Sequence, residues 1–237
     1  MKSKRAGKQT LLFTEPPRVI ASAAIVGELE GQGPLGGYFD EVLTDDTWGE
    51  ESWEKAERKM FEQSVRRALD KIGLESGDMD CLLGGDLLNQ IISANFAARE
   101  LKTPFLGLYG ACSTMAESLL IGSMLIDGGY AGRVACAATS HFCTAERQFR
   151  SPLEMGGQTT PTAQRTVTGA GSSILAYEGY TGKMLYGNVF ITAATIGRVV
   201  DLGITDTTNM GAAMAPAAAD TLCAHLSETG RSIRDYD

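Results

Sequence analysis

Positive charge is scarce in this sequence. Its 237 residues carry 21 Lys and Arg against 29 Asp and Glu, which gives a formal net charge of -8. Nucleic-acid binding depends mainly on neutralising phosphates with clustered Lys and Arg, so this balance argues against DNA or RNA as a partner. The one basic cluster is Lys2, Lys4, Arg5 and Lys8. We interpret it as a solvated, frayed tail, with weak contact to an anionic membrane as the alternative.

Long apolar runs are also missing. No run approaches the roughly 18 residues that a membrane-spanning helix needs. Residues 1–9 lack the apolar stretch of a signal peptide. We therefore expect synthesis in the cytoplasm, and any attachment to a membrane would have to be peripheral and come from partner proteins.

Paired cysteines and histidine clusters are absent too. The sequence has five cysteines and two histidines, and no Cys-x-x-Cys pair occurs. An odd number of cysteines, mostly inside apolar runs, supports neither a disulfide framework nor a zinc site. We expect a reducing compartment and no resident cofactor. The cysteines are Cys81, Cys112, Cys136, Cys143 and Cys223.

Short apolar segments alternate with segments that have helical periodicity. Continuous apolar strands between helices indicate an α/β fold with a parallel sheet covered on both faces. Ser52 is a good N-cap for the longest helix, which should run up to Gly73. The expected strands are 18–26, 80–85, 105–109 and 133–140, and the other expected helices are 88–101 and 114–126.

The sequence contains an internal repeat. Residues 19–27 match 189–197 in length, in an Ala-Ala pair and in the closing glycine. Further on, the helices before Gly73 and Gly230 both lead to an Asp-x-Asp segment. We therefore expect an N-terminal half over 1–187 and the beginning of a truncated C-terminal half over 188–237.

Cys112 is the first candidate site residue. Gly110-Ala-Cys-Ser-Thr places its thiol between a strand and the helix expected at 114–126. Unpaired N–H groups and the helix dipole stabilise a thiolate or an incoming anion at such a turn. The alternative is a cysteine buried in the core.

Asp86 and His141 follow two other expected strands. In a parallel sheet they would open into the same crevice as Cys112, where a histidine can act as a base or hydrogen-bond donor. The alternatives are a solvated loop histidine for His141 and, for Asp86, a cap on the next helix. The other histidine, His225, is expected on the surface of a helix.

Arg147 and Arg150 are candidate carboxylate clamps. A bidentate guanidinium can hold an acid that a negative surface would otherwise repel. The alternative is a set of surface ion pairs with Glu146 and Glu154.

These motifs resemble the thiolase-like superfamily and, within it, a family that serves spore formation in endospore-forming bacteria. The resemblance covers nearly the whole chain. It rests on Gly33-Pro-Leu-Gly, Gly85-Asp-Leu-Leu-Asn-Gln, Ala94-Asn-Phe, Gly110-Ala-Cys-Ser-Thr, Thr144-Ala-Glu-Arg-Gln-Phe-Arg, Thr166-Val-Thr-Gly, Asp201-Leu-Gly-Ile-Thr-Asp and Met214-Ala-Pro-Ala-Ala-Ala-Asp.

The resemblance implies a layered α-β-α-β-α fold, pairing as a homodimer, and a role in loading dipicolinic acid into the developing spore. Cys112 matches the nucleophile of thiolase-like enzymes, whereas their catalytic His or Asn partners lie in the second half and match no residue here. The resemblance also implies sporulation membrane proteins as partners.

Our leading hypothesis is a binding protein without catalytic activity. Asp86, Cys112 and His141 would line the former acyl pocket and hold the flat dicarboxylate or its calcium chelate, with Asp86 as a possible oxygen ligand of Ca²⁺. The alternative is an acyltransferase or condensing enzyme with Cys112 as nucleophile. A third reading is a structural partner of a membrane-embedded complex.

Overall fold

The computed structural model describes residues 4–149, 165–206 and 209–236. Its described residues group into two compact units, one over 15–149 and 165–190 and a smaller one over 4–14 and 191–236. Each unit is described by itself. The boundary between repeats expected at residues 187 and 188 remains a prediction.

The larger unit is built on a six-stranded sheet in the order β3-β2-β7-β6-β4-β5. Strand β7 runs antiparallel to both of its neighbours, while the other pairs are parallel. The prediction of a wholly parallel sheet is therefore wrong, because an apolar strand covered on both faces has the same pattern in either direction. The strands are β2 (Arg18–Val26), β3 (Glu41–Val42), β4 (Cys81–Gly85), β5 (Phe105–Gly107), β6 (Arg133–Ser140) and β7 (Gly169–Ala176).

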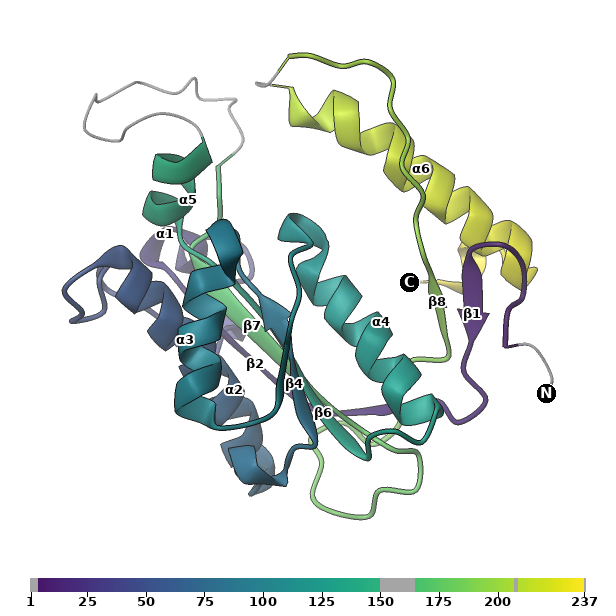
Figure 1. Ribbon diagram of the computed structural model, residues 1–237, viewed down its shortest axis with the longest axis horizontal. Coiled ribbons are helices and arrows are strands. Elements are labelled where there is room, and N and C mark those ends of the chain that lie inside the picture. The colour runs from purple at the N-terminus through teal and green to yellow at the C-terminus, as the bar shows by residue number, and fades with distance from the viewer. Residues whose placement is uncertain (1–3, 150–164, 207–208, 237) are drawn as a thin grey trace. The chain divides into compact units, whose positions relative to one another are not determined.

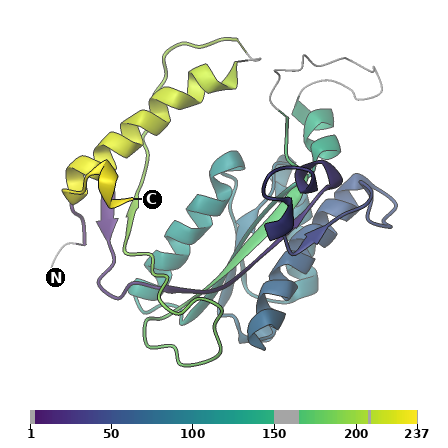
Figure 2. The same ribbon diagram turned by 180° about the vertical axis from the view of Figure 1, so that it is seen from behind.

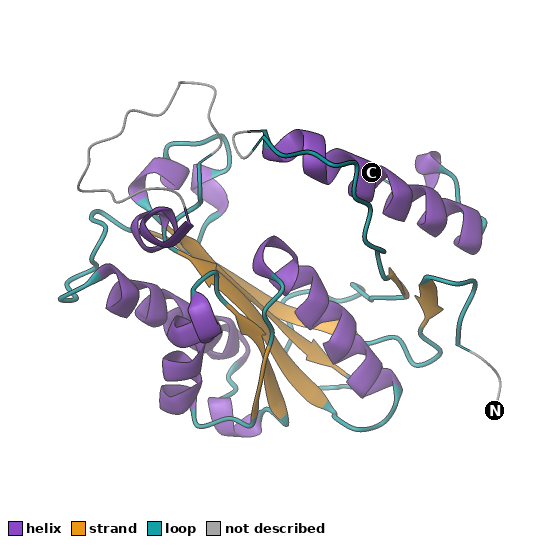
Figure 3. Ribbon diagram, turned by 45° about the horizontal axis from the view of Figure 1, so that its top comes forward, coloured by secondary structure: helices purple, strands orange, loops and turns teal. Residues whose placement is uncertain are grey.

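Helices cover both faces of this sheet (Figures 1 and 3). Helices α2 and α3 pack together on one face, and α4 packs on the other. Fully buried side chains such as Phe61, Leu82 and Ile174 fill the layer beneath α2. The helices of this unit are α1 (Glu28–Gly31), α2 (Trp53–Ile72), α3 (Ile92–Leu101), α4 (Thr114–Asp127) and α5 (Phe142–Phe149), with the 3-10 turns η1 (Gly36–Tyr38), η2 (Ser76–Asp78), η3 (Asn89–Ile91) and η4 (Ala111–Ser113).

Local sequence signals placed α2 correctly. The Ser52 hydroxyl accepts a hydrogen bond of 3.3 Å from the Lys55 N–H, which caps the first turn. Gly73 ends the helix in the left-handed region at φ 70°. The predicted bounds of this helix are confirmed.

Two expected elements are shorter than predicted. Helix α3 starts at Ile92 instead of residue 88, because Gln90 and Ile91 adopt positive φ values of 60° and 47°. Strand β5 ends at Gly107 and forms the edge of the sheet, where Leu106 is 52% exposed. The prediction that the strand before the Cys112 turn is buried is therefore wrong.

The smaller unit consists of a two-stranded antiparallel sheet and one long helix (Figure 2). Its elements are β1 (Thr10–Leu12), β8 (Ala193–Thr195), α6 (Met210–Thr229) and the 3-10 turn η6 (Ile233–Asp235). Within the segment 189–197, which matches residues 19–27, three residues form a strand, β8. The described part of the basic cluster is exposed to solvent, as expected, but it is not frayed, because Arg5 forms a β-bridge with Leu11. Lys2 lies outside the described residues.

The close approach of strand ends around β4 leads to a first prediction. A Cβ atom at Gly85 would lie 2.0 Å from the Leu108 carbonyl oxygen, whereas one at Gly171 of β7 would meet nothing within 4 Å. Gly85→Ala should lower the free energy of unfolding by about 1–3 kcal/mol, measured by urea denaturation. Gly171→Ala is the matched control and should leave stability unchanged or slightly higher. Equal losses in both variants would contradict the assigned packing.

Candidate functional site

The three candidate residues lie at one edge of the sheet. His141 follows β6, Asp86 follows β4 and Cys112 comes five residues after β5. These three strands are adjacent and parallel, so their carboxyl ends meet at the same edge, as predicted. Among the described residues, however, no hydrogen bond joins any two of these side chains.

Cys112 lies in an exposed tight turn. The thiol is exposed in the 3-10 turn η4, directly before α4, so the alternative of a buried core cysteine is wrong. The Ser113 N–H and hydroxyl both donate to the Gly110 carbonyl, at 3.0 and 2.8 Å. Ala111 is held at φ 48°, which is uncommon for a residue with a side chain. These contacts fix the backbone of the turn at the start of α4.

Glu117 is a neighbour of this turn that the sequence analysis missed. It lies in the first turn of α4, and its Oε2 atom is 2.3 Å from the position that a Cβ at Gly110 would occupy. An acidic residue at that position is favoured by the positive end of the helix dipole. Glu117 comes seven residues after Gly110, and nothing in the sequence marks it as a neighbour of the turn, so its proximity needed the structure.

Asp86 supports a loop. It is 1% exposed, and its two carboxylate oxygens each accept a backbone N–H at 2.7 Å, from Leu88 and from Ala94. Burial raises the pKa of this carboxyl, and the N–H donors act in the opposite direction. The capping alternative is confirmed, and contact with a ligand remains a prediction.

His141 is buried as well. Its Nδ1 accepts the Cys143 N–H at 3.1 Å, so Nε2 carries the proton and donates to the Asp46 carbonyl at 2.7 Å. Burial lowers the pKa of the imidazole, which favours the neutral form. The solvated-loop interpretation is therefore wrong. Both ring nitrogens are occupied by backbone groups, so neither is available to a thiol in this arrangement.

Of the two candidate arginines, the structure describes Arg147. Arg147 pairs with Glu54 of α2 and lies over the Trp53 ring, 5.5 Å from its centroid. It thus forms an ion pair, as the alternative proposed, but with a partner on another helix. Arg150 and Glu154 lie outside the described residues.

His225 is not a plain surface residue. In the smaller unit it is half-buried, with Nδ1 2.7 Å from Thr195 Oγ1 and Nε2 2.5 Å from the Tyr236 hydroxyl. The sequence did not predict these two hydrogen bonds, because a polar residue in an amphipathic helix is usually exposed. His225 serves to join α6 to β8 and to the turn after the helix.

A buried acid, Glu57, lies next to this edge of the sheet. It is fully buried on α2, where its Oε2 accepts a hydrogen bond of 2.8 Å from the Thr144 hydroxyl of α5. Burial, followed by repulsion from Asp86, raises its pKa to about 8. The sequence analysis did not single out Glu57, because its position in the sequence does not reveal that the side chain faces inward.

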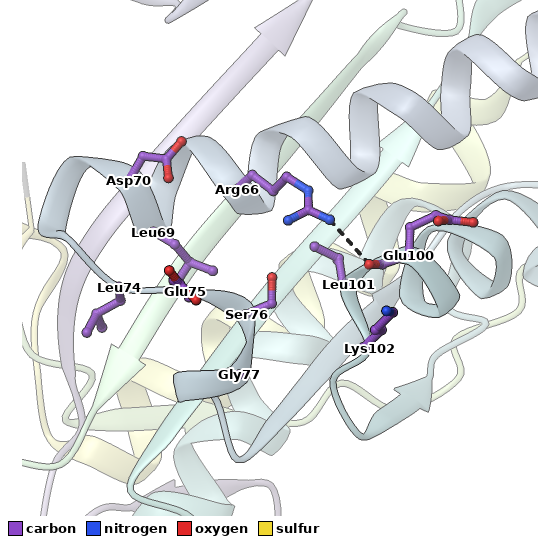
Figure 4. Close-up of a pocket in the computed structure, with 10 residues that line it drawn as sticks. All are labelled: Arg66, Leu69, Asp70, Leu74, Glu75, Ser76, Gly77, Glu100, Leu101 and Lys102. Carbon is purple, nitrogen blue, oxygen red and sulfur yellow. Dashed lines mark hydrogen bonds between the residues drawn. The ribbon is translucent and has the colours of Figure 1, made fainter.

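A pocket lies at the other end of the sheet (Figure 4). It has a volume of about 630 Å³ and lies where α2 and α3 end and before β4 begins. Arg66 donates to the Glu100 carbonyl at 3.2 Å across it, and its Nε is 2.7 Å from Glu62. The pocket includes none of the predicted site residues. Its lining is Arg66, Leu69, Asp70, Leu74, Glu75, Ser76, Gly77, Glu100, Leu101 and Lys102.

In the described part of the chain, no group of three or more His, Cys, Asp or Glu side chains is arranged to hold a metal ion. Within the same residues, no helix has both the length and the apolar character required to cross a bilayer.

The raised pKa of Glu57 predicts a pH dependence of stability. The folded protein keeps a proton up to about pH 8 that the unfolded chain releases near 4.5, so stability must fall as the pH rises through this window. Compared with Glu57→Gln, the native chain should lose up to about 1.4 kcal/mol more per pH unit in urea unfolding. Asp70→Asn changes an exposed acid of the same helix and should keep the native slope. An unchanged slope in Glu57→Gln would contradict the buried, protonated acid.

Comparison with solved structures confirms the expected fold. A cerulenin-bound structure of Xanthomonas campestris OleA matches with a TM-score of 0.64 at 12% identity, covering 95% of this chain and 74% of that one. The 3-oxoacyl-(acyl carrier protein) synthase III of Pseudomonas aeruginosa PAO1 matches with a TM-score of 0.54 at 12% identity, covering 91% and 72%. At such identities these matches show the thiolase-like fold alone.

Sequence comparison identifies the family. "Stage V sporulation protein AD" of Bacillus subtilis (strain 168) is 47% identical over 234 residues, which are 99% of this chain and 67% of the relative. The family profile described as Stage V sporulation protein AD matches residues 7–237. The chain is therefore a member of the stage V sporulation protein AD family.

Proposed function

We propose that this chain binds dipicolinic acid or its calcium chelate at the Cys112 turn and serves uptake of this dicarboxylate into the developing spore, without chemical turnover. It would act at the spore inner membrane as a peripheral protein, held there by other stage V sporulation A membrane proteins, and would pair as a homodimer.

The observation that carries the proposal is the exposed turn from Gly110 to Ser113 at the start of α4. The free N–H groups at a helix N-terminus attract carboxylates, and the small residues at this turn leave room for a flat ring. The thiol of Cys112 is exposed beside them. These features support the binding of a planar carboxylate at the turn.

The histidines favour binding over catalysis. An acyl-transferring thiol needs a group that takes up its proton or a strongly stabilised thiolate. His141 is held by two backbone groups, and His225 is hydrogen-bonded to Thr195 and Tyr236. Neither imidazole is therefore poised to activate Cys112 in this chain.

A calcium ion would offset the repulsion between the turn and a negatively charged ligand. The Glu117 carboxylate lies next to Gly110 and repels a ligand with two negative charges. A Ca²⁺ ion chelated by the ligand prefers further oxygen ligands and would turn this repulsion into attraction. Glu117 suits this role better than Asp86, because both oxygens of Asp86 are occupied by backbone N–H groups.

Calorimetric titration of dipicolinate, with and without calcium, tests the site. Cys112→Tyr fills the turn and should weaken binding at least about tenfold, whereas Cys223→Tyr alters the other exposed cysteine and should have no effect. Glu117→Gln should reduce the gain in affinity that calcium gives. Binding that is absent in the native chain, or equally weakened by both tyrosine variants, would refute the proposal.

The exposed thiol and the fold support one alternative, an acyltransferase. In that reaction the Cys112 thiolate attacks the carbonyl of an acyl thioester, a thioester forms on Cys112, and the free thiol of the carrier leaves. On our proposal, mass spectrometry after incubation with acetyl-coenzyme A should show no stoichiometric acyl adduct. A rapid adduct that disappears in Cys112→Ser would favour the enzyme.

A further inference from the structure

A small pocket lies between helices α2 and α3, which pack together on one face of the sheet (Figure 1). Its volume is about 250 Å³. Sites for drug-sized ligands usually measure about 300–1,000 Å³, so this pocket suits a smaller molecule. It includes none of the residues assigned above to the Cys112 turn. The described lining residues are Glu54, Lys55 and Arg58 of α2 and Ile92, Ser93 and Phe96 of α3.

Two of the three lining residues from α3 are apolar. Ile92 and Phe96 are four positions apart, so they lie on the same side of the helix. Their side chains are 46% and 44% exposed, although both residues belong to a helix that packs on its neighbour. Covering such a surface with the hydrocarbon part of a ligand is favourable in water.

The acid and the lysine of the pocket are already neutralised. The Glu54 carboxylate pairs with Arg147, and the Lys55 ammonium group pairs with Glu51. These two ion pairs balance their own charges. Among the described lining residues, this leaves the positive charge of Arg58 without a partner.

The Arg58 guanidinium is shielded from solvent on one side. Its Nε atom is buried and has no hydrogen-bond partner. No described residue forms an ion pair with Arg58. Glu100 attracts it from beyond ion-pair distance, since Arg99 and more weakly Arg58 lower the pKa of the Glu100 carboxyl. A guanidinium in this state is suited to a carboxylate, which it can hold through two N–H groups.

Ser93 adds a second polar group at the pocket. It is 2% exposed, and its hydroxyl oxygen has no hydrogen-bond partner of ordinary geometry. Burial raises the pKa of the nearby Glu57, and Ser93 acts in the opposite direction, yet Oε1 of that carboxyl also lacks such a partner. A serine hydroxyl has one donor and two acceptor sites, so it can interact with Glu57 and still donate to a ligand. Buried polar atoms without partners are rare in folded proteins, and a bound anion would satisfy this one.

We propose that this pocket binds an aromatic monocarboxylate of about the size of benzoate. The Arg58 guanidinium holds the carboxylate, the Ser93 hydroxyl is the second donor, and the ring of the ligand packs on Phe96 and Ile92. Aromatic rings attract each other beyond the effect of the area they bury, which favours a ring over a short alkyl chain. A second carboxylate on the ligand would be repelled by Glu54, so a monocarboxylate fits better than a dicarboxylate.

NMR titration of the isotope-labelled full chain with benzoate tests the pocket. Amide signals of residues 54–58 and 92–96 should shift and give one dissociation constant. Benzyl alcohol has the same ring without the charge and should bind at least about tenfold more weakly. Equal binding of the two compounds would overturn the proposal. Shifts confined to residues 110–117 would place benzoate at the Cys112 turn and would also overturn it.

A pair of arginine variants tests the role of the charge. Arg58→Gln should weaken benzoate binding at least about tenfold. Arg67→Gln removes a cation of the same helix that is paired with Glu41, and it should leave the binding unchanged. Since Arg58 has no partner among the described residues, its loss should not lower the thermal midpoint. Native affinity in Arg58→Gln would contradict the assigned carboxylate contact.

A second pair of variants tests the role of the ring. Phe96→Ala keeps the cation and should weaken benzoate binding roughly threefold to tenfold. Tyr130→Ala removes a ring that is 83% exposed outside the pocket and should have no effect. Equal affinity in these two variants would contradict packing on Phe96. Binding that weakens as the protein concentration rises would assign Ile92 and Phe96 to a contact between copies of the chain and would overturn the proposal.

Discussion

Backbone packs directly on backbone where the central strands reach their carboxyl ends. A Cβ atom at Gly84 would lie 2.2 Å from the Ala137 carbonyl oxygen, and one at Gly85 2.0 Å from that of Leu108. This contact holds β4 close to β6 and to the chain that leaves β5. Since the Cys112 turn follows β5 after only a few residues, its position depends on these two glycines.

Buried polar groups also stabilise this edge of the sheet. Asp86 holds the loop before α3 through the Leu88 N–H and the first turn of α3 through the Ala94 N–H. Glu57 links α2 to α5 through Thr144. Two acids in one buried region are unfavourable when both are charged, and protonation of Glu57 relieves this repulsion. The stability of the edge is thereby coupled to the ionisation of a residue outside the exposed turn.

Local patterns predicted what local chemistry determines. Ser52 and Gly73 fixed the ends of α2 because capping depends on residues within one turn. The direction of β7 could not be predicted in this way, since strand pairing is decided by distant partners. Burial of His141 and Glu57 was missed for a related reason. The sequence does not reveal which backbone or hydroxyl groups will form hydrogen bonds with a polar side chain.

The residues of the candidate site thus have two different physical roles. Cys112 and Glu117 form the accessible turn, whereas Asp86 and His141 are occupied by backbone groups. A buried group that holds a loop affects ligand binding through the shape of that loop, without touching the ligand. All three residues predicted from the strand ends can therefore matter to one function, although Cys112 alone among them is exposed. The strand-end pattern identified the right edge of the sheet, and hydrogen-bond partners distinguish the groups that meet solvent from those that support them.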